Sequence, residues 1–335
     1  MVRALGCLPV TPKHRELQAA RIAGASSFTT RAWRADGEPE TYAWDSAFEK
    51  ILDRRTRLAD RYRDAGISLY PWEILKRLPA SRKLTDRFYW NQGSVPSCSM
   101  HGAMHSAQAS MLVDIAFGAP RRYDALNPIY PFFIARGGNL AGGLDLAETA
   151  EQLNRGGAYP ASEVGEDNTS APRDWRRFRD CAQQRQAAVI YVEDDLVEKI
   201  FRACRAAFHV TFGSGVYYNK AKLDRNGVKV LCSEGYGGHA QSLGSWREVN
   251  GTEYVFLTNS WGDAYAIDDQ REERPRGESR GAHTDAGTSC PASGGWLDKD
   301  ALAVLARSMP NYGAPFIALY ENPEKAADAR LIERI

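Results

Sequence analysis

The sequence contains no long apolar run and almost no excess of either charge. No apolar stretch approaches the roughly 20 residues that a helix needs to cross a bilayer. The 43 Lys and Arg residues are balanced by 42 Asp and Glu residues, which leaves a formal net charge of +1. Such a balance gives no electrostatic basis for binding nucleic acid or an anionic membrane. We therefore expect neither as a partner.

Internal repeats and low-complexity domains are also absent, and the first residues do not form an export signal. Residues 4–10 are apolar, but this stretch is short, contains Pro9 and is followed directly by the polar residues 13–16. The stretch is at the short limit for the apolar region of a signal peptide, so secretion is not expected. The length of 335 residues is enough for one large core, or for two lobes with an extension.

A turn rich in Gly, Ser and Pro, residues 91–97, runs into Cys98, and a helix-like run of small and apolar residues follows. A cysteine at a helix start is a favourable nucleophile, because unpaired N–H groups and the positive end of the helix dipole stabilise a thiolate. A lone cysteine is nevertheless more often a small buried apolar residue. A catalytic role for Cys98 therefore requires partners elsewhere in the chain.

Two downstream segments supply such partners. His239, in Gly-Gly-His-Ala, follows Cys98 by 141 residues (239 − 98), and Asn259, in Asn-Ser-Trp-Gly, follows it by 161 (259 − 98). These separations are close to those of papain-type proteases. With Gln92-Gly93 shortly before Cys98, the three motifs in this order resemble the papain-like (C1-type) cysteine peptidase family.

The resemblance implies an α+β fold with two lobes, a helical lobe followed by a β-rich lobe, and an active cleft between them. It covers about residues 77–320 and leaves residues 1–76 as an N-terminal extension and 321–335 as a C-terminal tail. A hydrophilic insertion at about residues 263–293 follows Asn259 closely in the chain. An exposed loop at that position could gate the cleft.

The resemblance also implies the catalytic roles. Cys98 would be the nucleophile, and His239 would form an ion pair with it, protonate the leaving amine and later activate water. Asn259 would orient the imidazole of His239. The backbone N–H of Cys98 and the side-chain amide of Gln92 would form the oxyanion hole.

Supporting and substrate-binding residues are implied by the same motifs. Trp261 would shield the bond between Asn259 and His239, with Ser260 beside it. The paired glycines Gly142 and Gly143 would let a substrate backbone lie alongside the protein, and Gly238 would border the cleft.

Several positions depart from the family pattern. Ser99 replaces the usual tryptophan after the nucleophile, and Gly238 stands where many relatives carry Asp or Asn. Secreted relatives also bond two cysteines at the positions that Val95 and Leu140 occupy here. Because both partners are apolar, we expect a reducing compartment, cytoplasmic or within a virus particle.

The other histidines do not indicate a metal site. His101 and His105 lie three and seven residues after Cys98, on the same helix face, but that face is expected to point away from the cleft, and a metal would quench the thiolate. His209 and His283 lack a supporting motif and are interpreted as core or surface residues. No metal or cofactor is expected.

The extension has one clear element. Residues 44–65 have apolar positions at spacings of three, four and seven, which predicts an amphipathic helix with a charged opposite face that includes Arg55. Residues before it are mixed and turn-rich, and no helix is predicted there. The helix could be an accessory element, an inhibitory pro-segment or a docking arm for a protein assembly, and an autoprocessing zymogen would be cleaved between about residues 65 and 80.

The predicted function is thiol-dependent hydrolysis of peptide or isopeptide bonds in a polypeptide substrate, with acyl transfer to another amine as a variant of the same chemistry. The alternative is a papain-fold module that serves a larger assembly, such as a virus particle, with little or no turnover. The N-terminal extension and the insertion favour this alternative, whereas the intact set of Cys98, His239, Asn259 and Gln92 favours the enzyme.

Overall fold

The computed structural model describes residues 6–25, 41–176, 187–261, 267–268, 283–285, 288–291 and 293–320. Within these ranges, no helix is both long enough and apolar enough to span a membrane. The predicted C-terminal tail and most of the predicted 263–293 insertion lie outside the described residues.

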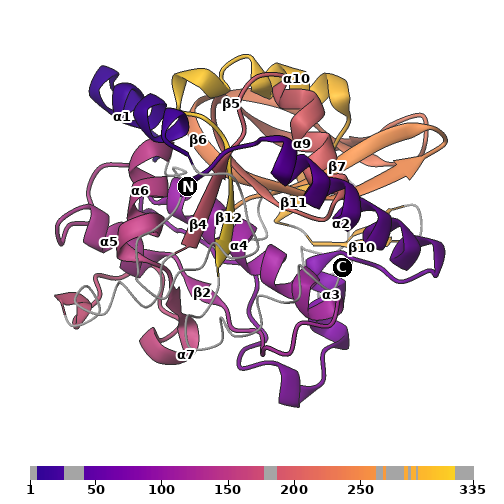
Figure 1. Ribbon diagram of the computed structural model, residues 1–335, viewed down its shortest axis with the longest axis horizontal. Helices are drawn as coiled ribbons and strands as arrows, with labels where there is room; N and C mark the ends of the chain where they lie inside the picture. Colours follow the sequence, from indigo (N-terminus) through magenta and orange to yellow (C-terminus); the bar gives the residue numbers. More distant parts are fainter. Residues whose placement is uncertain are drawn as a thin grey trace.

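The fold is of the mixed α+β class, as the sequence predicts. The helices between residues 129 and 164 gather on one side, and the long strands lie on the other together with the helices at Ser46–Asp64, Leu196–Arg205 and Lys299–Ala306 (Figure 1). Each side has its own apolar core. The helices are α1 (Pro12–Ala23), α2 (Ser46–Asp64), α3 (Pro71–Arg77), α4 (Cys98–Ala116), α5 (Ile129–Ala135), α6 (Leu146–Gly156), α7 (Ala161–Val164), α9 (Leu196–Arg205) and α10 (Lys299–Ala306), with 3-10 turns at Ala80–Arg82 and Met309–Asn311.

The main sheet has the strand order β1-β4-β12-β5-β6-β11-β7, with β8 paired to β5 and a further pairing of β6 with β7. Its two long central strands, β5 and β6, are antiparallel. In their pairing, Gly213 on β5 faces Ala240 on β6, and Ser214 faces His239. The strands are β1 (Thr41–Tyr42), β2 (Leu126–Asn127), β3 (Tyr159–Pro160), β4 (Ala187–Tyr191), β5 (Val210–Leu223), β6 (Lys229–Val249), β7 (Thr252–Thr258), β8 (Ile267–Asp268), β9 (His283–Asp285), β10 (Thr288–Cys290), β11 (Gly294–Leu297) and β12 (Phe316–Tyr320).

Helix α4 lies at the junction of the two sides and begins at Cys98, as predicted. Nearly every residue from Cys98 to Val113 is buried, because the helix packs against α5 and α6 on one side and β5, β6 and β12 on the other. Close packing requires small residues. A Cβ at Gly102 would lie 3.0 Å from the carbonyl oxygen of Gln241 on β6, so glycine at this position lets the strand approach the first turn of the helix.

Helix α1 corrects the prediction that the early part of the extension, through residue 30, is mixed and turn-rich. It starts at Pro12 with Thr11 as its N-cap, whose side chain accepts a hydrogen bond from the His14 N–H. Only Gln18 is buried along its length, so it lacks the apolar stripe on which helix prediction depends. Its capping residues and its contacts with α6 hold it in place (Figure 1).

Helix α2 confirms the predicted amphipathic helix, with one correction. Phe48 and Leu52 enter the core of the strand-rich side, as their spacing predicts. Arg55, which the sequence places on the charged face, is instead buried. Its guanidinium donates to Asp114 on α4 and to the carbonyl oxygen of Ala206.

Candidate active site

Cys98 occupies the N-terminal position of α4 and is fully buried. The preceding residue, Ser97, is the N-cap but makes no capping hydrogen bond to the helix backbone. The first N–H groups of α4 are therefore not occupied by an N-cap side chain and can act on the sulfur or on a developing oxyanion.

His239 comes to Cys98 from β6. The N–H of its neighbour Ala240 donates to the Cys98 sulfur at 3.4 Å, so the residue that follows His239 contacts the sulfur directly. The close approach at Gly102 makes this contact possible, because β6 lies directly against the first turn of α4.

Asn259 fixes the orientation of the His239 ring. It follows the last residue of β7, and its Oδ1 lies 2.8 Å from Nε2 of His239. The same oxygen accepts the backbone N–H of Ser260 at 2.7 Å, which sets the direction of the side-chain amide. Since Nε2 is bonded to Asn259, the ring nitrogen for proton exchange with Cys98 is Nδ1.

Gln92 is tied to the same segment. Its backbone N–H donates to the carbonyl oxygen of Ser260 at 2.8 Å, and its side-chain oxygen accepts the Ser260 hydroxyl. The amide nitrogen of Gln92 donates to the Val95 carbonyl at 2.9 Å. Ser260 therefore links the residue that orients His239 to the residue predicted to bind the oxyanion.

Trp261 stacks on His239, with ring centroids 4.1 Å apart and an interplanar angle of 21°. Tyr217 from β5 meets both rings edge-on. These aromatic rings lie against the fully buried imidazole. The predicted role of Trp261, shielding the bond between Asn259 and His239, stays a prediction.

Residues 6–10, the covering segment, pass Cys98 with the backbone N–H groups of Gly6 and Cys7 facing its sulfur. Leu144 donates its N–H to the Gly6 carbonyl at 3.1 Å and accepts the Leu8 N–H at 3.2 Å, so the segment runs parallel to the chain at Leu144. The Cys7 side chain points toward Gly213, and a Cβ there would meet its sulfur at 2.7 Å. Gly6 and Cys7 therefore occupy the space beside the Cys98 sulfur.

The predicted substrate glycines meet this segment at two of three positions. A Cβ at Gly143 would lie 1.6 Å from the Gly6 carbonyl oxygen, and one at Gly238 would lie 2.1 Å from the Cys7 carbonyl oxygen. Gly142 instead has a φ of +73° and lies beside Arg136. Gly143 and Gly238 therefore do allow a backbone to approach, and the backbone that does so is residues 6–7.

The covering segment changes the chemistry of the thiol. Burial raises the pKa of Cys98 to about 11, although the backbone N–H groups of Ala240, Gly6, Ser99 and Cys7 act to lower it. In this state Cys98 is a neutral thiol at ordinary pH. The groups that Gly6 and Cys7 present to the sulfur are N–H donors rather than a carbonyl carbon, so the segment is not placed for attack.

Helix α1 anchors the covering segment to α6. His14 Nδ1 lies 2.7 Å from Asp145 Oδ2, and Arg21 forms an ion pair with Glu151. The Gln18 side-chain oxygen accepts the Ala314 N–H at 3.0 Å. Residues 6–10 are thus followed by a helix that is attached at three points.

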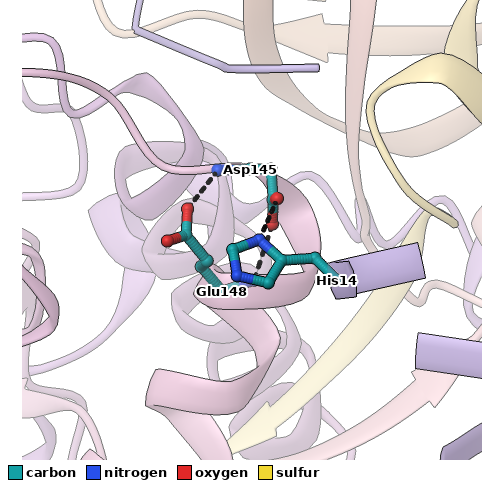
Figure 2. Close-up of side chains that lie close together, drawn as sticks. All are labelled: His14, Asp145 and Glu148. Atoms are coloured by element: carbon teal, nitrogen blue, oxygen red, sulfur yellow. Dashed lines mark hydrogen bonds and ion pairs between the residues drawn. The ribbon is translucent and has the colours of Figure 1, made fainter. Parts of the chain in front are cut away.

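His14, Asp145 and Glu148 bring three ligand-type atoms within 4.8 Å of one another (Figure 2). The cap of α6 accounts for both carboxylates, because Asp145 accepts the Glu148 N–H at 2.8 Å and Glu148 accepts the Asp145 N–H at 3.0 Å. The second Asp145 oxygen is bonded to His14. We interpret the group as a helix cap that holds α1, and assign no metal to it.

Four histidines remain besides His14 and His239. His101, His105 and His209 are buried, which agrees with the core interpretation for His209. The side chain of His283 lies outside the described residues. His101 contacts Ser97 and Asn168, whereas His105 packs between Phe88 and Tyr89.

Two features of the site were not predicted from the sequence: the covering segment 6–10 and Asn168. The segment carried one signal, a glycine followed by a small residue ahead of a proline-started helix, but nothing local indicated the cleft as its place. Asn168 lies in a polar, turn-rich stretch where asparagine is common. Its partners are 67 and 77 residues away in the chain.

Comparisons with known proteins return structures only, since no family model and no curated protein matches the chain. One similar structure is xylellain, a cysteine protease from Xylella fastidiosa, with 14% identity and a TM-score of 0.45 over 74% of this chain and 88% of that one. Another is digestive procathepsin L 3 from the larval midgut of Tenebrio molitor, with 10% identity and a TM-score of 0.45 over 92% and 100%. A third is procathepsin B S9 from Trypanosoma congolense, with 10% identity and a TM-score of 0.42 over 72% and 74%. The roles assigned below rest on the geometry of this chain.

Proposed function

We propose that this protein is a papain-like cysteine peptidase that residues 6–10 hold in a latent state. The observation that carries the proposal is the convergence of three elements. Helix α4 supplies Cys98, β6 supplies His239 and the end of β7 supplies Asn259, with Ala240 bonded to the sulfur and Asn259 to the imidazole. A buried structural cysteine has no need of a histidine that an asparagine orients, at the residue adjoining the one bonded to its sulfur.

The chemistry follows from this arrangement. With the cleft open, the thiol proton passes to Nδ1 of His239 and the sulfur attacks the substrate carbonyl carbon. The developing oxyanion accepts hydrogen bonds from the Cys98 N–H and the Gln92 amide. Collapse breaks the C–N bond as Nδ1 returns the proton to the leaving amine. A water deprotonated by His239 then hydrolyses the thioester and restores the thiol.

Latency follows from the covering segment. Residues 6–10 exclude substrate from Cys98, and their burial of the sulfur disfavours the thiolate. Displacement of the segment would readmit water and polar groups to the sulfur, and the thiolate would then be stabilised by the helix start and by the imidazolium of His239.

The experiment compares alkylation of Cys98 by iodoacetamide from pH 4 to 9 in the full chain and in a chain lacking residues 1–10, followed by peptide mass spectrometry. Each form is made with native His239 and as His239→Ala, and near-UV circular dichroism checks folding. We expect slow labelling of the full chain, fast labelling of the shortened chain near pH 5, and loss of the fast phase in His239→Ala. The shortened chain should also cleave a mixed peptide substrate.

The alternative, a papain-fold module without turnover, predicts another result. Cys98 of the shortened chain would then be labelled only near the ordinary thiol pKa of about 8.5, and His239→Ala would leave the profile unchanged. That outcome would reject the peptidase mechanism.

A further inference from the structure

His101 lies one turn into α4, fully buried, and uses both of its ring nitrogens. Nδ1 lies 3.0 Å from the carbonyl oxygen of Ser97 and 3.1 Å from the Ser97 hydroxyl. Nε2 lies 3.1 Å from the side-chain nitrogen of Asn168. The ring therefore joins the residue directly before Cys98 to an asparagine from a distant loop.

Asn168 makes a second contact, at the start of the turn 91–97 that ends with Ser97. Its side-chain nitrogen donates to the carbonyl oxygen of Asn91 at 3.0 Å. Because a carbonyl oxygen can only accept, the group that faces Asn91 is the NH₂ of Asn168. One hydrogen goes to Asn91 and the other to His101, so His101 Nε2 is the acceptor and Nδ1 carries the proton that goes to Ser97.

The loop that carries Asn168 is itself held. Asn127, at the end of β2, donates from its side-chain nitrogen to the carbonyl oxygens of Gly165 and Asp167, both at 2.9 Å. Asp167 accepts the N–H groups of Thr169 and Ser170. Asn168 therefore projects from a braced loop, as a positioning group must.

We propose that His101 and Asn168 are positioning residues for the oxyanion hole, an inference that rests on the proposed function. Their contacts clamp Asn91 at one end of the turn and Ser97 at the other. Gln92 follows Asn91 and the Cys98 N–H follows Ser97, so the two clamped ends carry the two oxyanion donors. His101 and Asn168 fix the spacing between these donors without touching the substrate.

The clamp works only with a neutral imidazole. Protonated His101 would present an N–H to the NH₂ of Asn168, and the two donors would repel. Burial lowers the pKa of His101 to about 4, so the neutral ring persists through the pH range in which the reaction is proposed to run.

The test uses the full chain and the variants His101→Leu and Asn168→Asp, with His105→Leu as the matched control. The control removes another buried histidine from the same helix, one whose ring nitrogens have no hydrogen-bond partner among the described residues. For each protein we measure kcat/KM on a peptide substrate and the rate of Cys98 alkylation by iodoacetamide. Both reactions require the covering segment to open. We therefore divide kcat/KM by the alkylation rate, and in this quotient the equilibrium constant for opening cancels.

Alkylation forms no oxyanion, whereas peptide hydrolysis does. We expect the quotient to fall about 10-fold or more in both variants, through kcat rather than KM, since loss of one oxyanion donor costs about 10²–10³ in kcat. It should stay within about twofold of wild type in His105→Leu.

Two outcomes would overturn the inference, and they are distinguishable. If the wild-type chain cleaves peptides and the quotient is unchanged in both variants, His101 and Asn168 serve folding alone and the proposed function stands. If wild-type Cys98 is alkylated but no peptide is cleaved, the proposed function fails and the positioning role fails with it.

Discussion

Single glycines decide how closely backbones approach around Cys98. Gly102 admits β6 to the helix, Gly143 and Gly238 admit residues 6–7, and Gly6 fits against Pro96 with no room for a side chain. Each contact is between backbone atoms that cannot move aside cheaply. Substitution at these positions should therefore act on whole segments rather than on one contact.

Gly6→Ala provides the residue-scale prediction. A Cβ at residue 6 would lie 2.0 Å from the Pro96 carbonyl oxygen, so the alanine must push the segment away from the cleft. We expect Cys98 of the full chain to be alkylated at least about 10-fold faster, the equivalent of about 1.4 kcal/mol of lost segment binding. An unchanged rate would show that the segment does not limit access to the sulfur. Gly66→Ala is the control for backbone strain alone: its Cβ would meet nothing within 4 Å, but its φ of +71° strains the backbone at an exposed turn, so it should leave the alkylation rate unchanged.

Local motifs made the central residues of the candidate site predictable, and long-range contacts limited the rest. Cys98, His239, Asn259 and Gln92 stand in short motifs whose order and spacing could be compared with a family, and the structure brings all four together. The clamp of His101 and Asn168 has no such motif, because each partner is an ordinary polar residue until the fold joins them. The same holds for the covering segment.

At the scale of elements, the sequence predicted the helices that have a clear local signal. The spacing of the hydrophobic residues in 44–65 and the run of small and apolar residues after Cys98 each predict a helix, and the structure has α2 at Ser46–Asp64 and α4 at Cys98–Ala116. Helix α1 and strand β12 were missed, since α1 has no apolar stripe and β12 is a short run near the chain end. Their positions depend on tertiary pairing, α1 with α6 and β12 with β4 and β5.

The prediction at the scale of elements concerns Arg55 on α2 and the free energy of unfolding. It pairs with Asp114 and lies over the rings of Phe117 and Phe208, so it joins α2 to α4 and to the loop after α9. Arg55→Ala leaves Asp114 with a single arginine partner, Arg121, among the described residues. Because loss of one partner of a buried ion pair typically costs about 3–5 kcal/mol, we expect the free energy of unfolding in urea to fall by about 3 kcal/mol.

Arg57→Ala on the same helix is the matched control, because Arg57 is exposed. A surface substitution of this kind should change the free energy of unfolding by no more than about 0.5 kcal/mol. Equal effects of the two substitutions would mean that Arg55 contributes through helix propensity and not through the ion pair.

At the scale of the whole molecule, α4 serves both sides at once. Its first turn carries Cys98. Further along the helix, the buried hydroxyl of Ser106 lies 2.9 Å from the hydroxyl of Ser242 on β6, and Thr211 on β5 donates to Ser106 at 2.9 Å. Three features depend on how this helix lies between the helical and strand-rich sides: the clamp of His101 and Asn168, the proposed triad of Cys98, His239 and Asn259, and the covering segment 6–10. Conditions that loosen its packing should therefore affect stability and activity together.

Low pH is expected to loosen the packing of α4, because three buried histidines lie on or near this helix. Burial lowers the pKa of His101 to about 4 and the pKa values of His105 and His209 to about 3, against about 6.5 in an unfolded chain. Between those limits the unfolded chain binds more protons than the folded one, so stability is complete above about pH 6.5 and declines as pH falls. Each histidine contributes about 1.4 kcal/mol per pH unit, and the three together about 4.

Urea unfolding at pH 7.5, 6.0 and 5.0 measures this dependence directly. We expect the free energy of unfolding to change little from pH 7.5 to above 6.5 and to drop steeply toward pH 5.0. In His105→Leu the slope between pH 6.0 and 5.0 should be shallower by about 1.4 kcal/mol per pH unit, because one proton fewer is taken up on unfolding. If the two proteins lose stability in parallel, His105 is protonated in the folded chain, and the buried ring must have a polar neighbour that accommodates its charge.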